Sequence, residues 1–468
     1  MNIKRLVLSV MVGAVSLGIA TSCKKKDEGR IVKFEFLDAG LGRDVYKAMK
    51  EAYEAEHPEV TINLIPNYQI NNTVQNNLSS GKNVSDIYSI RGLSVIEQFY
   101  IKGWIMDLKD IVYEAEIADG KTLIDLADSS VINYVDYNGH YICIPEYVNV
   151  NGFVYNKKMF EQYGWTIPTT TEQMTALCNR IVSDTEGQVK PFAFCGEAQG
   201  YIYYLLNGIN TSYQGIANMD KFYEFESPET FAPTNQVGKS YALKTMVDWY
   251  TESNGYVFER ALDLKAMAAQ RKFLNGEAAM MLNGSWFETE MSKFINPSEH
   301  EFAMFKVPEY SEGGVVKHAE GYTSEDGKGV LDSEYTANYI IPTASKHKED
   351  AIDFLKFIQR PDICELYTKY CNSVRPFKYN LDPTSETYAS MSSFGKSVLA
   401  MANSNTLYVA ASKNSLAIGG YLSAWPLPED NYHYNALLSG GADVSQRLKA
   451  EYDYVNSSWS RWQEQING

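Results

Sequence analysis

The sequence predicts an α/β protein built from two domains that are joined by a hinge. The chain has 468 residues, a length at which two or more domains are common. Near its start, the chain reads as a strand, a loop, an amphipathic helix and a second strand, over residues 31–37, 38–42, 43–56 and 60–65. Such a unit predicts a parallel sheet with a right-handed crossover. In mid-chain, an interrupted strand pair predicts the passage from one domain into the other.

This passage begins with a strand over residues 141–145. The strand should stop at Pro145, because proline has no N–H to donate to a central ladder. Residues 146–152 are polar and irregular, residues 153–155 form a second short strand, and Asn156 can cap a helix through its side chain. Residues at the break would then face the gap between the domains.

The rest of the chain alternates helices and strands around one long polar region at residues 309–337, which predicts a long loop. Beyond it, residues 339–342 read as a strand that returns to the first domain, with a second crossing near residues 335–339. The other predicted helices span residues 70–80, 95–101, 171–182, 196–207, 241–250, 266–274, 349–359, 388–402 and 444–466. The other predicted strands span residues 84–90, 192–194, 278–282 and 302–307.

Composition excludes some partners. The chain has 58 acidic and 42 basic residues, a formal net charge of −16. Nucleic-acid affinity comes largely from lysine and arginine on phosphates, so no nucleic-acid partner is expected. The same charge disfavours an extended contact with anionic lipid. The 34 tyrosines offer flat apolar faces with polar tips, which suit sugar binding but also ordinary surfaces.

The first residues read as a targeting signal. Lys4 and Arg5 precede an apolar run at residues 6–20, which is shorter than the ~20 residues that a membrane-spanning helix needs. Small residues then lead to Cys23, which resembles the cleavage box of a bacterial lipoprotein. Residues 1–22 would be removed, Cys23 would carry lipid, and residues 23–30 would form a polar tether. The alternative is an ordinary secretory signal cut nearby. Either way, we expect an exported protein whose body lies outside the membrane.

The other five cysteines give no metal-site pattern. They are widely spaced and form no C-x-x-C pair, so no metal is expected. Buried free thiols are the simplest interpretation, and one disulfide is the alternative in an exported protein.

Several segments resemble the extracellular solute-binding proteins of bacterial ABC importers, in particular their carbohydrate-type group. Residues 141–145 match the Y-x-I-P segment of that family, residues 155–160 its Y-N-K-x-x-F segment, and residues 164–168 its G-x-x-x-P segment. Residues 273–286 match F-x-x-G-x-x-A-M followed by G-x-W. Further matches lie at residues 53–62, 81–87, 103–108 and 345–357, with Ser85 where the family has proline. The resemblance covers roughly residues 31–376.

This resemblance implies a periplasmic-binding-protein-like fold, in which a hinge joins two α/β domains with the ligand cleft between them. Residues 31–145 with 337–390 would form the N-terminal domain, and residues 146–336 with 391–468 the C-terminal domain. The protein would bind a carbohydrate, in particular an oligosaccharide, close around it and deliver it to the transmembrane subunits of an ABC permease. We expect a monomer without a cofactor, held at the outer face of the cytoplasmic membrane by its lipid anchor.

Two residues are predicted to contact the ligand from the resemblance. Trp286 matches an aromatic position that stacks on a sugar ring in maltose-type relatives, where C–H groups pack on the indole face. The alternative is a tryptophan buried in the core. Glu146 matches a carboxylate that accepts hydrogen bonds from sugar hydroxyls in the cleft.

Four further candidates come from their place in the chain. Asp38 and Arg91 follow strands of the first domain, and ligands of parallel sheets lie beyond the carboxyl ends of strands. The alternative for this pair is an ion pair with each other on the rim. Tyr147 and Asn149 lie at the break beside the hinge.

No enzyme signature is present in the sequence. It contains no H-E-x-x-H, no G-x-S-x-G and no complete phosphate loop. Two alternatives to an importer component remain: a secreted carbohydrate-acting enzyme that uses a pair of carboxylates, and a sensor module that binds a ligand without delivering it.

Overall fold

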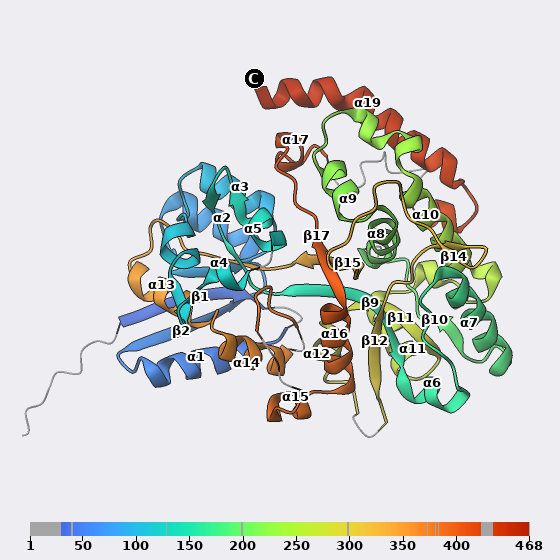
Figure 1. Ribbon diagram of the computed structural model, residues 1–468, viewed down its shortest axis with the longest axis horizontal. Helices are drawn as coiled ribbons and strands as arrows, with labels where there is room; N and C mark the ends of the chain where they lie inside the picture. The colour runs from blue at the N-terminus through green and yellow to red at the C-terminus, as the bar shows by residue number, and fades with distance from the viewer. Residues whose placement is uncertain are drawn as a thin grey trace, which may run out of the picture.

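The computed structural model has two lobes, each built on its own sheet (Figure 1). It describes residues 30–467 apart from residues 39–40, 128, 198–199, 297–298, 372, 380, 382 and 423–433. The predicted signal segment and Cys23 lie outside the described residues. The N-terminal lobe lies to the left in Figure 1 and the C-terminal lobe to the right, with β9 (Val148–Asn156) running from the boundary into the C-terminal lobe.

The sheet of the N-terminal lobe has the strand order β2-β1-β3-β16-β8. Its strands are β1 (Arg30–Leu37), β2 (Val60–Asn67), β3 (Ile87–Ile90), β8 (Ile144–Pro145) and β16 (Asn338–Ile340). As predicted from the first β-loop-α-β unit, β1 is parallel to β2, and it is also parallel to β3. The late strand β16 joins antiparallel to both β3 and β8. The carboxyl ends of β1 and β3 therefore meet at one edge of this sheet.

The sheet of the C-terminal lobe is organised around β9. It has the order β10-β11-β9-β15-β17, and β12 also pairs with β9. Its other strands are β10 (Lys190–Phe192), β11 (Ala278–Gly284), β12 (Phe302–Lys306), β15 (Gly329–Tyr335) and β17 (Asn405–Val409). The outer part of β9 contacts β11 and β12, and its first residues pair with β15.

Helices cover both sheets. Those of the N-terminal part are α1 (Asp44–Glu56), α2 (Ile70–Ser80), α3 (Leu93–Ile101), the π-helix η1 (Lys109–Tyr113), α4 (Leu123–Leu126) and α5 (Ser129–Val135), joined later by α13 (Lys348–Phe357) and α14 (Pro361–Cys371). The others are α6 (Lys157–Tyr163), α7 (Thr171–Asp184), α8 (Gly200–Gln214), α9 (Ile216–Tyr223), α10 (Val237–Tyr250), α11 (Ala266–Leu274), α12 (Phe287–Glu290), α15 (Glu386–Ser390), α16 (Ser393–Ser404), α17 (Ser415–Ile418), α18 (Tyr434–Leu438) and α19 (Val444–Asn467).

Short elements complete the fold. They are the 3-10 helices η2 (Pro228–Phe231), η3 (Pro233–Asn235), η4 (Glu252–Asn254) and η5 (Ala261–Asp263), and the strand pairs β4 (Glu116–Ala118) with β5 (Lys121–Thr122), β6 (Asp136–Tyr137) with β7 (His140–Tyr141), and β13 (Ser311–Glu312) with β14 (Val315–Val316).

The chain passes between the two sheets at the places that the sequence predicts. β8 belongs to the first sheet and β9 to the second, so the first crossing lies at residues 146–147. The return from β15 to β16 crosses at residues 336–337. The predicted cap at Asn156 is confirmed, because its side chain accepts the N–H of Met159 at the start of α6.

Two strands of the second sheet contradict the sequence prediction. The predicted long loop at residues 309–337 contains β15, which pairs with both β9 and β17. β17 was not predicted at all. In β15, Asp332 and Glu334 occupy the positions that alternate with Leu331, Ser333 and Tyr335. Charged residues at alternate positions resemble an exposed loop when the pairing partners are unknown.

Among the residues that the structure describes, no helix combines the length and apolar character that crossing a bilayer requires.

Candidate ligand-binding cleft

Trp286 stands at the end of a central strand, with its ring over a glycine. The strand β11 is buried along its whole length and ends at Gly284. A Cβ atom added to Gly284 would lie 1.9 Å from Cζ3 of Trp286. The indole ring therefore occupies the space in which any other residue has its first side-chain atom. Trp286 is only partly buried, which distinguishes it from the fully buried core tryptophan that was the alternative.

Two tyrosines of α8 extend this aromatic surface. The ring centroids of Tyr204 and Trp286 are 5.8 Å apart with the rings at 62°, and those of Tyr201 and Tyr204 are 5.9 Å apart at 77°. Aromatic rings favour such edge-to-face contacts. We call Trp286, Tyr201 and Tyr204 the aromatic corner. The sequence indicated only a tyrosine-rich helix; the spacing of three, which places both tyrosines on one helix face, is the signal that could have identified them.

A polar floor adjoins the aromatic corner. It consists of Asn149 and Asn151 in β9 and Asp332 and Glu334 in β15. Glu334 lies opposite Asn149 in the strand register, and Nδ2 of Asn149 donates to Oε1 of Glu334 over 2.9 Å. Residues two apart in a strand share a face, so the four side chains belong to one face of the sheet.

The charged groups of the polar floor act on Tyr204 of the aromatic corner. Burial raises the pKa of Tyr204, the negative charges of Glu334 and Asp332 raise it further, and the positive charge of Arg91 opposes them. All three charged groups therefore lie within electrostatic reach of the Tyr204 hydroxyl. Because Tyr204 also contacts Trp286, the two surfaces form one continuous site.

Arg91 faces this site from the other lobe. It follows β3 of the N-terminal lobe, and its side chain is exposed. Its charge holds down the pKa of Glu334 and of Tyr147, against the effect of burial on both groups. Arg91 thus lies across the gap from a carboxylate of the C-terminal lobe, as expected for a group between two domains.

The ion pair that was the alternative for Asp38 and Arg91 is wrong. Asp38 pairs with Arg43 instead, with Nε donating to Oδ1 over 2.9 Å, and this partner lowers the pKa of Asp38. Asp38 is therefore neutralised within its own loop, while Arg91 remains available. Further along this loop, a Cβ added to Gly42 would lie 3.7 Å from Cγ2 of Thr289 in α12. The two lobes nearly touch here.

Glu146 lies differently from its predicted position. Its side chain is fully buried, where it accepts a hydrogen bond from Ser89 and one from the Tyr367 hydroxyl over 3.2 Å. Burial raises its pKa, and the hydrogen bond from Ser89 and the charge of Arg375 oppose this shift. In this structure the carboxylate is occupied inside the protein and does not face the cleft. Tyr147 is also nearly buried, with 6% of its surface exposed.

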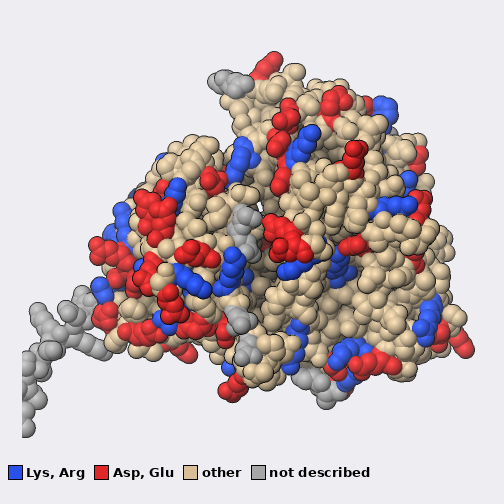
Figure 2. Space-filling view, in the orientation of Figure 1, with Lys and Arg blue, Asp and Glu red and all other residues tan. Residues whose placement is uncertain are grey.

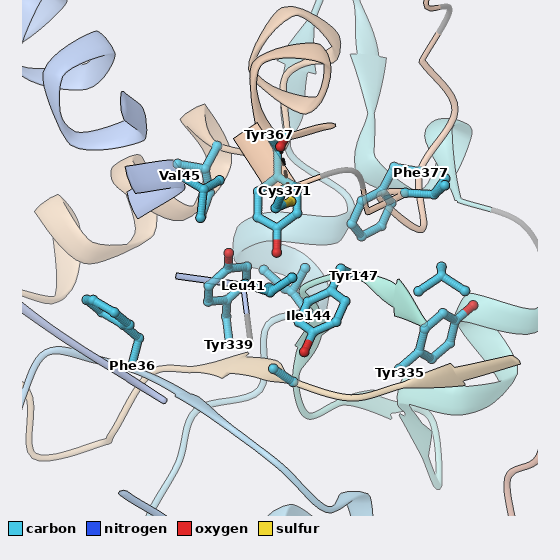
Figure 3. Packing of buried hydrophobic residues seen from close by; sticks show 14 of the residues in the cluster. Phe36, Leu41, Val45, Ile144, Tyr147, Tyr335, Tyr339, Tyr367, Cys371 and Phe377 are labelled. Atoms are coloured by element: carbon cyan, nitrogen blue, oxygen red, sulfur yellow. Dashed lines mark hydrogen bonds between the residues drawn. The ribbon is translucent and has the colours of Figure 1, made fainter. Parts of the chain in front are cut away.

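Arg375 connects the segments through which the chain crosses between the lobes. Its guanidinium donates to the backbone oxygen of Glu146 at the first crossing and, over 3.5 Å, to the hydroxyl of Tyr339 in β16, just after the second. It also lies 4.8 Å from the centre of the Tyr367 ring. The hydroxyl groups of Tyr339 and Tyr367 point into the same central space (Figure 3). We call Glu146, Arg375, Tyr339 and Tyr367 the hinge network.

A late segment, residues 411–418, bridges both lobes on the side of α3. We call it the strap. On the N-terminal lobe, Nζ of Lys413 donates to Oε1 of Glu97 over 3.4 Å, and Nε2 of Gln98 donates to the oxygen of Ile418 over 3.3 Å. On the C-terminal lobe, Nδ2 of Asn414 donates to the oxygen of Glu224 over 3.0 Å. The lobes cannot separate on this side without breaking the strap's hydrogen bonds to one lobe or the other.

We predict that replacing Lys413 with methionine loosens the strap in a pH-dependent way. Glu97 is 1% exposed, and burial raises its pKa while Lys413 opposes the shift. Loss of Lys413 raises that pKa further, so the free energy of unfolding should fall by about 1 kcal/mol at pH 7.5, the low end for a buried group that loses a partner. The loss should be smaller below about pH 3, where Glu97 is protonated in both states, and the remainder belongs to the hydrogen bond from Lys413 to the backbone oxygen of Tyr134.

Urea unfolding of both proteins at the two pH values measures this effect. Lys449→Met is the control, because Lys449 pairs with Asp453 on an exposed helix face and such pairs contribute little. A loss that is equal at both pH values would contradict the role of Glu97.

A hollow of ≈ 1030 Å³ adjoins the hinge. Both lobes border it, with Ser130 and Asn133 on one side and Tyr223 and Tyr408 on the other. Figure 2 shows the surface hollowed between the lobes, with acidic and basic side chains at its border. Its lining residues include none of the aromatic corner or the polar floor, so this hollow is separate from that site.

No group of histidine, cysteine, aspartate and glutamate side chains among the described residues has the arrangement of a metal site. The five cysteines of the described part are buried, and none forms a disulfide with another.

Two lobes on separate sheets, connected by crossings, with an aromatic and polar surface on one lobe and Arg91 facing it from the other, form the architecture of a two-domain binding protein. The family model of the bacterial extracellular solute-binding proteins matches residues 39–363, and the chain belongs to this family. Its members bind solutes and are not enzymes, so the prediction that the chain is not an enzyme is confirmed.

Two relatives have sugar-binding names. The xylose/arabinose-binding protein XacG of Haloferax volcanii is 25% identical over 254 residues, which cover 53% of this chain and 51% of the relative. The multiple sugar-binding protein of Streptococcus mutans serotype c is 23% identical over 367 residues, 76% of this chain and 78% of the relative. The first match thus spans about half of the relative's length.

Solved structures share the fold. RafE in complex with raffinose has a TM-score of 0.63 at 16% identity, covering 91% of this chain and 99% of that one. A chitin oligosaccharide binding protein also has a TM-score of 0.63 at 16% identity, covering 92% and 100%. These likenesses confirm the predicted periplasmic-binding-protein-like α/β fold.

Proposed function

We propose that this protein is the substrate-binding component of an ABC importer and captures a carbohydrate, in particular an oligosaccharide, between its lobes. The observation that carries the proposal is the contact of the aromatic corner with the polar floor. A pyranose ring presents C–H groups on its faces and hydroxyls at its edge. The first suit the Trp286 ring, and the second suit carboxylate and amide groups such as Glu334 and Asn149.

The comparisons support the same ligand class. The two curated relatives and the two solved structures are sugar-binding proteins by name. Trp286, Asn149, Tyr147 and Arg91 fit this role as ligand contacts, and Tyr204 and Glu334 join them. Asp38, paired with Arg43, and Glu146, inside the hinge network, act on the site indirectly in this proposal.

The proposal includes the motion of the two domains. Residues 31–145 with 337–390 and residues 146–336 with 391–468 would move as units about the crossings. A ligand that contacts Arg91 on one side and Glu334 on the other favours the closed arrangement, because it binds that arrangement more tightly. The permease subunits would recognise the closed form. The protein would reach these subunits as a monomer.

Titration calorimetry of residues 24–468 with neutral mono- and oligosaccharides tests the proposal. We expect at least one oligosaccharide to bind and to be recovered unchanged. Trp286→Ala should weaken it at least thirtyfold, since a buried aromatic contact of this kind contributes about 2 kcal/mol. Trp104→Ala is the control, because Trp104 packs beside Lys102 in the N-terminal lobe. Binding of no sugar, or equal binding by Trp286→Ala, would refute this function.

Membrane attachment through Cys23 is part of the proposal and has its own test. Wild-type protein in cells given labelled palmitate should acquire the label and fractionate with membranes. Cys23→Ala should do neither. An unlabelled wild-type protein would favour the ordinary secretory signal.

A further inference from the structure

The polar floor contains two carboxyl groups that form no ion pair with any described residue. Asp332 and Glu334 lie two residues apart in β15, so their side chains share one face. Glu334 accepts hydrogen bonds from Asn149 over 2.9 Å and from Thr336 over 3.4 Å. Asp332 accepts one from Thr211 over 3.4 Å. These donors are neutral, and neither carboxylate forms an ion pair with any part of the chain that the structure describes.

Nearby cations are engaged elsewhere or lie across the gap. Lys306 lines the same small cavity as Asp332, but its ammonium donates to Glu309 over 2.7 Å. Arg91 acts on Glu334 from the other lobe without forming an ion pair with it. Burial raises the pKa of Asp332, and the charge of Glu334 raises it further. Both acids of the floor thus lack a paired cation among the described residues, and a bound cation would favour their ionised forms.

The floor also lacks hydrogen-bond donors. Asn149 and Asn151 are each 3% exposed, and the side-chain oxygen of each has no hydrogen-bond partner among the described residues. Asn151 lines the same small cavity as Asp332 and Tyr204. The amide of Asn149 cannot be reversed, because its nitrogen donates to Glu334. An unsatisfied buried acceptor costs free energy, so a ligand that brings donors here would relieve that cost.

We infer that the cleft takes a saccharide with a protonated amino group, placed so that the ammonium lies over the polar floor while the sugar ring lies on Trp286. This inference rests on the proposed function and adds the class of sugar. An ammonium brings one positive charge and three donors, whereas a hydroxyl brings one donor and no charge. Charge-assisted hydrogen bonds are about twice as strong as neutral ones. Trp286 also favours a cation near its face.

Calorimetry with matched sugars tests this inference. Glucose, glucosamine and N-acetylglucosamine, and their β-1,4-linked disaccharides, differ in the group at one position, and the galactose series gives a second configuration. We expect the free amine to bind at least tenfold more tightly than the neutral and the acetylated sugar of the same series. Raising the salt concentration should reduce that advantage, because it depends on charge.

Two variants assign the effect to the floor. Glu334→Gln and Asp332→Asn keep size and shape but cannot ionise, and each should weaken the amino sugar at least ten times more than it weakens the neutral sugar of the same series. Glu312→Gln is the control, since Glu312 is exposed in the β13–β14 pair. The melting temperature of each variant without ligand checks its folding.

The outcomes separate this inference from the proposed function. Neutral sugars that bind as tightly as their amines would refute the inference and leave the importer function standing. Equal losses for both sugars in Glu334→Gln would refute it as well. Failure of every sugar to bind would refute both.

Discussion

Replacement of Arg375 with methionine should lower the free energy of unfolding by about 3–5 kcal/mol. Arg375 is 2% exposed, and its guanidinium contacts the first crossing, β16 and the ring of Tyr367. Its positive charge also opposes the effect of burial on Glu146. Methionine fills much of the volume but leaves the Glu146 carboxylate without a neighbouring cation. Equilibrium unfolding in urea, followed by tryptophan fluorescence, measures the loss.

The double variant Arg375→Met with Glu146→Gln separates charge from packing. If the loss comes from an uncompensated carboxylate, removing that charge should restore a large part of the stability, and the two changes should not be additive. Arg360→Met is the matched control, because Arg360 forms partly exposed ion pairs with Glu56 and Asp362; it should cost about 1 kcal/mol or less. Strictly additive losses would mean that Arg375 acts through packing alone.

Gly284→Ala should abolish ligand binding although no group that contacts the ligand is removed. The new methyl group would lie 1.9 Å from the Trp286 ring, so the ring must leave its place over the strand. A displaced ring no longer meets Tyr204 at 5.8 Å. We expect a loss of at least a hundredfold in affinity, larger than for Trp286→Ala, because the displaced ring also obstructs the site. Calorimetry with the sugar found for the wild type measures it.

Gly441→Ala is the control for this substitution. A Cβ there meets no atom closer than 3.5 Å, so binding should be unchanged. A crystal structure of Gly284→Ala should show the indole in a new position. Normal affinity in this variant would mean that Trp286 does not contact the ligand.

The sequence predicts much of the fold because its signals are local. The β-loop-α-β unit, the stop at Pro145 and the cap at Asn156 each depend on residues close together in the chain. β15 was missed because its pairing depends on strands that are distant in the sequence. Ser333 of β15 pairs with Val150 of β9, and Gly329 of β15 pairs with Asn405 of β17. Burial between its neighbours, and not its composition, makes it a strand.

In the candidate site, too, local sequence signals identified some residues, whereas residues that depend on distant contacts were missed or misplaced. The G-x-W pattern led to Trp286 because the close approach of ring and glycine is encoded within three residues. Glu146 was assigned to the cleft because the sequence does not reveal Ser89, Tyr367 and Arg375 around it. Asp332 and Glu334 were hidden in the missed strand. Tyr201 and Tyr204 needed the position of α8 over the sheet to be recognised.

The strap should affect how long a solute stays bound, independently of the residues that contact the solute. Its contacts, through Lys413, Asn414 and Ile418, do not involve the aromatic corner or the polar floor. Escape from a closed cleft requires the lobes to part, so the dissociation rate depends on how often the strap detaches. Substitutions in residues 411–418 can therefore change the rate of release, and with it the rate of delivery, without altering the groups that recognise the solute.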